Sequence, residues 1–263
     1  GEPTMPKCLV CYKWALDEKD IKIKSDDCSL DVTRAKGKIS DFDRNAIEEA
    51  TLLVEQQGGA LDALTYGTSA VNQSLKDVLS RGPDSAYFIA DKSAEKADAY
   101  VTANVLAAAI RKLGSYDLIL CGEGSSDSFN QQTAVRVAAL LGLPCVSYVL
   151  KLSVENGTVK ATRGLGVATE VATVKGPVVL SVLGQINHPR IPSLKQVLGA
   201  AKKPKKEIKI ADLGLTPDQL QPREVHRSVK GFVTHRKHIA FKEANTAANV
   251  AKLVSSLAAE GLQ

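Results

Sequence analysis

Short apolar runs alternate with segments of helical periodicity through the first half of the chain. Residues 7–13 and 63–67 are apolar runs of strand length, whereas residues 43–57 carry apolar side chains at helical spacing. The further elements predicted in this half are helices over residues 72–81, 96–113 and 130–141 and strands over residues 86–90 and 116–122. This βαβα order predicts an α/β fold with a mostly parallel sheet and helices on both faces.

A β-hairpin is predicted where this alternation stops. Residues 145–154 and 158–162 read as strands, and between them stands Asn156-Gly157, the strongest short-range signal for a two-residue hairpin turn. Residues 167–174 and 178–184 have the pattern of two further strands.

The last part of the chain has a weaker pattern. Prolines interrupt the periodicity beyond Asn187, and only residues 243–260 look like another long helix. We therefore expect an extended C-terminal arm that wraps a partner rather than forming a core of its own. Residues 1–4, ahead of Met5, read as an expression scar.

Composition narrows the class of protein. With 44% hydrophobic and 24% charged residues over 263 positions, the chain resembles an ordinary soluble protein. No uninterrupted apolar stretch approaches the roughly 18 residues of a membrane-spanning helix, so we expect a cytoplasmic protein without stable membrane insertion. The net charge of +5 includes a lysine cluster at residues 202–206, but no aromatic-rich pattern accompanies it, so nucleic-acid binding is not expected.

The cysteines and histidines do not predict a metal site. Four of the five cysteines lie in or beside apolar runs, as buried free thiols do in reducing compartments. Cys8 and Cys11 form a C-x-x-C pair, but residues three apart on a strand project from opposite faces. His235 and His238 supply two ligands where a zinc site needs three or four. No catalytic triad or paired carboxylates can be placed in one cleft either.

The segment over residues 116–133 carries the most informative chemistry. An apolar strand ends in a loop that contains Gly122, Gly124, Ser125, Ser126 and Ser128 and then opens a helix. Glycines permit close backbone approach, and the amides at a helix start suit an anionic phosphate. The loop lacks the third glycine of the dinucleotide fingerprint and the Gly-Lys-Ser/Thr of a P-loop. Phosphate binding and a plain strand-to-helix turn both remain open at this point.

Two other predicted strands end at the same edge of the sheet. Cys11-Tyr12-Lys13 follows the first strand and Tyr66-Gly67-Thr68-Ser69 follows the second. Open parallel sheets bind ligands at the carboxyl ends of their strands. We therefore expect all three loops to rim one cleft.

Several ordered blocks of sequence carry a family resemblance. They are Cys11-Tyr12-Lys13 with Asp17-Glu18, Lys38-Ile39-Ser40-Asp41-Phe42-Asp43, Lys76 to Pro83, Gly122-Glu123-Gly124-Ser125-Ser126-Asp127 with Gln131-Gln132, and Pro189-Arg190-Ile191-Pro192-Ser193-Leu194 running into Leu198 to Pro204. Over residues 5–215 the chain resembles the electron-transfer flavoprotein β subunit family, especially its FixA-like branch. The fold implied is an adenine nucleotide α hydrolase-like domain over residues 5–215, with residues 216–263 as a C-terminal arm and helix that contact an α subunit.

The resemblance also implies cofactors. In this family an α subunit holds the working FAD, and the β subunit holds AMP or, in electron-bifurcating members, a second FAD. The implied cofactor-binding positions are Cys11, Ser40, Asp41, Phe42, Asp43, Tyr66, Gly122, Gly124, Ser125, Ser126, Asp127, Gln131, Gln132 and Thr133. Related AMP-type subunits carry Asn-Pro-Phe in place of Ser40-Asp41-Phe42 and an Asp-rich loop in place of Asp127-Ser128-Phe129, so AMP and FAD both stay open.

Three functions follow from these patterns. The first is an electron carrier without autonomous catalysis, whose Leu194 matches the family leucine that anchors partner flavoenzymes of the acyl-CoA dehydrogenase or reductase type. The second is an electron-bifurcating subunit whose own FAD oxidises NADH. The third is a stand-alone nucleotide-binding module of the universal-stress type.

Overall fold

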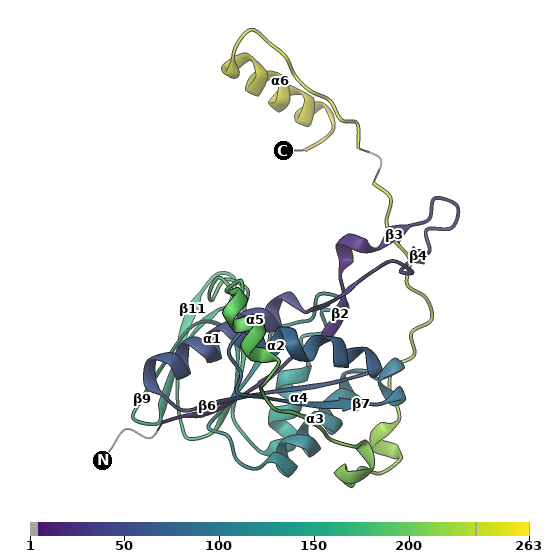
Figure 1. Ribbon diagram of the computed structural model, residues 1–263. Coiled ribbons are helices and arrows are strands. Elements are labelled where there is room, and N and C mark those ends of the chain that lie inside the picture. The colour runs from purple at the N-terminus through teal and green to yellow at the C-terminus, as the bar shows by residue number, and fades with distance from the viewer. Residues whose placement is uncertain (1–4, 235, 263) are drawn as a thin grey trace. The chain divides into compact units, whose positions relative to one another are not determined.

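A nine-stranded sheet forms the framework in the computed structural model, which describes residues 5–234 and 236–262 (Figure 1). The strand order is β11-β10-β9-β12-β8-β1-β6-β7-β13. The strands are β1 (Lys7–Cys11), β6 (Ala60–Gly67), β7 (Ser85–Ala90), β8 (Leu118–Gly122), β9 (Cys145–Glu155), β10 (Thr158–Gly164), β11 (Thr169–Lys175), β12 (Val178–Val182) and β13 (Lys205–Glu207). All neighbours from β9 to β13 in this order pair in parallel, and only β9–β10 and β10–β11 are antiparallel. The predicted expression scar lies outside the described residues.

Helices cover both faces of this sheet (Figure 1). One face packs against α1 (Asp41–Gln57), α2 (Leu75–Ser80) and α5 (Leu194–Ala200), and the other against α3 (Ala99–Leu113) and α4 (Thr133–Leu141). Strand residues alternate between the two cores, so Cys8 joins the α1 side and Cys11 the α3 side. The predicted α/β class is therefore confirmed, and the C-x-x-C cysteines do face opposite ways.

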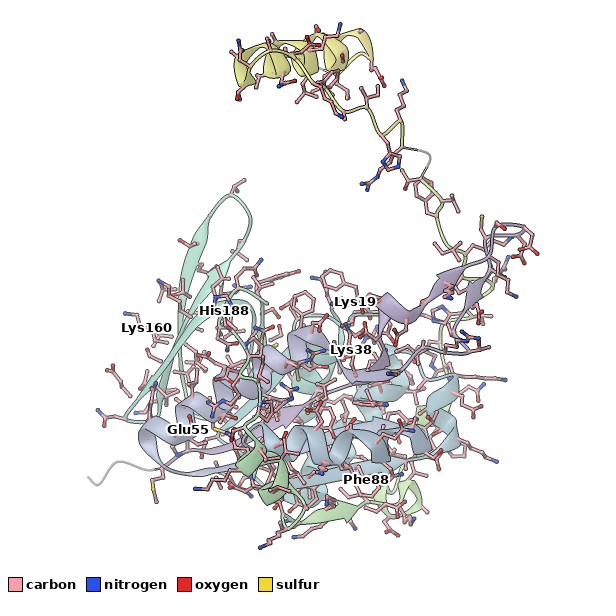
Figure 2. The ribbon with its side chains drawn as sticks, turned by 45° about the horizontal axis from the view of Figure 1, so that its top comes forward. Lys19, Lys38, Glu55, Phe88, Lys160 and His188 are labelled. Carbon is pink, nitrogen blue, oxygen red and sulfur yellow. The ribbon has the colours of Figure 1, made fainter. Side chains whose placement is uncertain are left out.

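The predicted hairpin is present. Asn156 and Gly157 have φ values of 50° and 72°, as the type I′ turn between two twisted strands requires. They connect β9 to β10, with Glu155 opposite Thr158. Lys160, labelled in Figure 2, is exposed on β10.

Several short elements were not predicted. β2 (Trp14–Leu16) pairs antiparallel with β5 (Gly37–Ile39), and the 3-10 helices are η1 (Glu18–Asp20), η2 (Ser69–Ser74), η3 (Lys92–Glu95), η4 (Ile210–Leu213) and η5 (Asp218–Leu220). Three predicted helices begin later than expected, because η2 precedes α2, Asp98 caps α3, and the positive φ of Gln131 delays α4.

The contacts divide the chain into two units. The larger takes the chain up to Lys22 together with Asp31–Val229. The tail packs on this unit as far as Val229: Ile208 is buried in the core, and Asp98 accepts hydrogen bonds from the backbone of Arg223 and Glu224 at 2.6 and 3.0 Å.

The smaller unit joins Ile23–Leu30 to the chain from Lys230 onward. The strands β3 (Lys22–Ile23) and β4 (Leu30–Asp31) form a small pair, and the Gly231 amide donates to the Cys28 carbonyl at 2.7 Å. The predicted last helix is present as α6 (Thr246–Ala259), capped by Asn245. Within the described part of the chain, no helix combines the length and apolar character needed to cross a membrane.

Candidate functional site

A cavity of about 420 Å³ lies at the carboxyl ends of β8, β1, β6 and β7. Its walls include the loops that begin at Cys11, Tyr66 and Gly122, as the sequence predicted, and a fourth loop between β7 and α3. This is the edge at which open parallel sheets place their ligands. The volume falls toward the lower end of the ~300–1,000 Å³ range of small-molecule sites.

Most of the predicted cofactor-binding residues line this cavity. They are Cys11, Asp43, Tyr66, Gly122, Gly124, Ser125, Asp127, Gln131, Gln132 and Thr133. The other four, Ser40, Asp41, Phe42 and Ser126, brace the loop instead of lining the cavity. The Ser126 amide donates to Ser40 Oγ at 3.1 Å, the Asp41 amide donates to Ser126 Oγ at 3.0 Å, and Phe42 packs on Phe129 with ring centroids 5.5 Å apart. Binding of a cofactor by any of these residues stays a prediction.

Asp43 joins two of the loops at the cavity floor. Its carboxylate accepts hydrogen bonds from the Lys13 amide at 2.8 Å and the Gly122 amide at 3.0 Å. Burial raises the pKa of Asp43 to about 7, against the opposing effect of these two hydrogen bonds. A Cβ atom on Gly122 would stand 2.6 Å from Asp43 Oδ1 and 2.7 Å from the Phe42 carbonyl carbon. Only glycine at this position therefore allows the end of β8 to approach the first turn of α1 so closely.

The loop after β8 leaves donors facing the cavity. Buried Glu123 anchors its start by accepting bonds from Ser181 Oγ at 2.5 Å and the Tyr148 amide at 2.8 Å. Gln131 is in the left-handed region at φ 55°, a strained backbone conformation for a residue other than glycine. Within the described residues no side chain caps the start of α4, because the Gln132 side chain accepts a bond from Arg136 instead. The first amides of α4 are thus left to bind an anion.

One ion pair joins two of the loops in the cavity wall. Lys13 Nζ, from the loop after β1, lies 2.6 Å from Asp127 Oδ2, in the loop after β8. Burial opposes ionisation of Asp127, but hydrogen bonds from Lys13 and Ser125 lower its pKa below the ordinary value. Asp127 is therefore a carboxylate at neutral pH.

The rest of the cavity wall combines polar side chains with an apolar part. Cys11, Val71, Ala99, Leu106 and Cys121 contribute to this apolar part. A hydrogen bond with Cys11 and burial together raise the pKa of the Cys121 thiol well above its usual range, so the thiol stays protonated. Such a wall suits the flat face of a purine, and the amides and hydroxyls on the β8 side suit a phosphate. The donor set thus fits an adenine mononucleotide.

Sequence reasoning missed one side of the site. The segment over residues 94–99 and His226 also line the cavity. Asp98 caps α3 by accepting a bond from the Val101 amide at 2.9 Å, and an acidic residue before an apolar helical run is a recognisable N-cap signal. No local pattern in the sequence predicts that His226 lines the cavity. Its position depends on the distant hydrogen bonds that the Arg223 and Glu224 amides donate to Asp98.

Within the described part of the chain, no group of three or more His, Cys, Asp or Glu side chains is arranged to hold a metal ion. His235, one of the two histidines weighed as ligands, lies outside the described residues.

Comparison with known families identifies the domain. The model of the family described as "Electron transfer flavoprotein domain" matches residues 28–213. This match covers well over half of the chain. It includes three of the four strands whose carboxyl ends border the cavity, β6, β7 and β8, together with helices α3 and α4. The chain belongs to the electron transfer flavoprotein domain family.

Proposed function

We propose that the chain is the β subunit, of the FixA-like branch, in a heterodimeric electron-transfer flavoprotein, with an adenine nucleotide in the cavity and FAD held mainly by an α subunit. The observation that supports this most strongly is the cavity itself, with the uncapped start of α4 at one end and a partly apolar wall beside it. The flavin would supply the redox chemistry. This chain would bind the nucleotide, contact the α subunit and dock partner enzymes, without catalysis of its own.

The cavity favours AMP over a second FAD. Its volume of about 420 Å³ suits a mononucleotide, whereas FAD would have to place its second phosphate, ribityl chain and flavin ring beyond these walls. We therefore propose a simple electron carrier rather than a bifurcating subunit that oxidises NADH. The universal-stress alternative leaves the C-terminal helix without a role.

Helix α6 supports an interface with the α subunit. Val250, Leu253, Val254 and Leu257 recur at helical spacing and are all exposed, and no residue of α6 is buried. An amphipathic helix with an uncovered apolar stripe gains stability by packing on a partner. We propose the α subunit as that partner, in a cytoplasmic complex.

The nucleotide content of the complex tests the assignment. The chain is co-expressed with its α subunit, the purified complex is denatured, and released nucleotides are quantified by chromatography. We expect one FAD and one AMP for each heterodimer. Two FAD without AMP would favour the bifurcating alternative, and failure to form any complex with an α subunit would contradict the β-subunit assignment.

Leu194 is proposed as the anchor for the partner flavoenzyme. It begins α5 behind a Ser193–Gln196 capping box and is 74% exposed, so its side chain contributes little to the core. We expect Leu194→Ala to weaken binding to an acyl-CoA dehydrogenase by ~2 kcal/mol, as loss of a central anchor does. Titration of the enzyme with the heterodimer measures this, and the thermal midpoint should not move.

The matched control is Val225→Ala, which shortens an equally exposed apolar side chain outside α5. It should leave the affinity unchanged. Equal effects of the two variants would show that Leu194 is ordinary surface.

A further inference from the structure

The Asp127 carboxylate occupies a cluster of hydrogen-bond donors on the β8 side of the cavity. Lys13 Nζ approaches its two oxygens at 2.6 and 2.8 Å, Ser125 Oγ donates at 2.6 Å, and the Ser128 amide donates at 2.7 Å. An ammonium, a hydroxyl and a loop amide converging on one point are the donors that proteins offer to a phosphate group. Here these donors surround a carboxylate of the protein itself, that of Asp127.

We propose that Asp127 determines nucleotide specificity by standing where a second phosphate would bind, so that the cavity accepts AMP and rejects ADP and FAD. This inference rests on the proposed adenine-nucleotide site. To that proposed site it adds one residue, Asp127, which limits the bound nucleotide to a single phosphate.

The donors on the β8 side of the cavity leave room for one phosphate while Asp127 is in place. The uncapped amides at the start of α4 can take one phosphate. A second phosphate on the same cavity wall would need Lys13, Ser125 or Ser128, and all three already bond Asp127. It would also meet the negative charge of Asp127, and like charges repel at close range. A monophosphate meets neither obstacle.

The test compares the affinities of the full-length chain for AMP, ADP and FAD. Trp14 is the only tryptophan and lines the cavity, so its fluorescence reports binding, and calorimetry supplies an independent measure. The variants are Asp127→Asn, which removes the charge and keeps the shape, and Asp127→Ala, which also removes the acceptor. The matched control is Glu95→Gln, which removes a carboxylate from the other end of the same cavity.

We expect the wild type to bind AMP at least about tenfold more tightly than ADP. Asp127→Asn and Asp127→Ala should each tighten ADP by about tenfold or more while AMP changes by less than about threefold. Glu95→Gln should leave the AMP-to-ADP ratio unchanged.

Two results would overturn the inference and leave the proposed function standing. The first is an unchanged AMP-to-ADP affinity ratio in both Asp127 variants, provided that they still bind AMP. The second is a change of this ratio in Glu95→Gln as large as in the Asp127 variants. A wild-type chain that binds none of the three nucleotides, alone or with its α subunit, would overturn both.

Discussion

Arg190→Gln is expected to lower the free energy of unfolding by about 3 kcal/mol, because it leaves a buried carboxylate without its counter-charge. The Arg190 guanidinium lies 2.8 Å from Glu48 and 2.6 Å from Glu55, and the Glu48 side chain is only 7% exposed. The Arg190 amide also donates to Glu48 at 3.0 Å. Urea unfolding of the wild type and the variant at neutral pH measures the loss.

The same ion pairs fix the segment that leads to Leu194. Arg190 ties it to α1, on which Glu48 and Glu55 both lie (Glu55 is labelled in Figure 2). We therefore expect Arg190→Gln to weaken partner docking as well, through misplacement of Leu194 rather than loss of a contact.

A double-mutant cycle separates the buried pair from general disruption. Glu48→Gln combined with Arg190→Gln should recover part of the stability, because no buried charge is then left unpaired. Arg223→Gln, which breaks the exposed pair with Asp218, should leave the unfolding midpoint nearly unchanged. If Arg190→Gln behaved like Arg223→Gln, the Glu48 carboxylate would have to be solvated and the ion pair unimportant.

The sequence predicted the parts of the fold that depend on local patterns. Strands such as β1 and β8 alternate between two helix layers, and each ends in a loop, so the cleft at their carboxyl ends could be expected from the pattern alone. The Asn156-Gly157 turn is equally local, since both residues adopt positive φ readily.

The missed elements depend on contacts between distant residues. β13 has three exposed polar residues and no periodicity, and it is a strand only because it pairs with β7. β2 and β5 are defined by each other across the intervening loop. Likewise Ser40 and Phe42 contact the β8 loop through a hydrogen bond and a ring contact, and both contacts join residues far apart in the sequence. No window of local sequence contains such information.

Asp43 is expected to make the stability of the protein fall as pH rises from about 4 to 7. In the unfolded chain the carboxyl releases its proton near its ordinary pKa of 3.8, whereas in the folded protein burial holds the pKa at about 7. Between these values the folded state binds more protons than the unfolded state, so raising the pH favours unfolding. Above pH 7 both states are ionised and the contribution is constant.

The variant Asp43→Asn isolates this effect, because every other titrating group is common to both proteins. At pH 5 the variant should be less stable by about 2 kcal/mol. Asparagine has an NH₂ group in place of one carboxyl oxygen, and this group cannot accept a hydrogen bond, so either the Lys13 amide or the Gly122 amide is left unpaired. Between pH 5 and pH 8 the wild type should lose about 3 kcal/mol relative to the variant, so that at pH 8 the variant becomes the more stable by about 1 kcal/mol. Urea unfolding at pH 5, 6, 7 and 8 measures the difference.

The trend between pH 5 and pH 8 decides which force governs Asp43. Burial and the Asp127 charge favour the acid, whereas two backbone amides and the nearby Lys13 charge favour the carboxylate. A wild-type advantage that stayed constant from pH 5 to pH 8 would mean that the hydrogen bonds win and that Asp43 is ionised well below neutral pH. An advantage that shrinks would mean that burial wins. In that case a phosphate bound on the β8 side would raise the pKa of Asp43 further, and nucleotide binding would be accompanied by proton uptake near neutral pH.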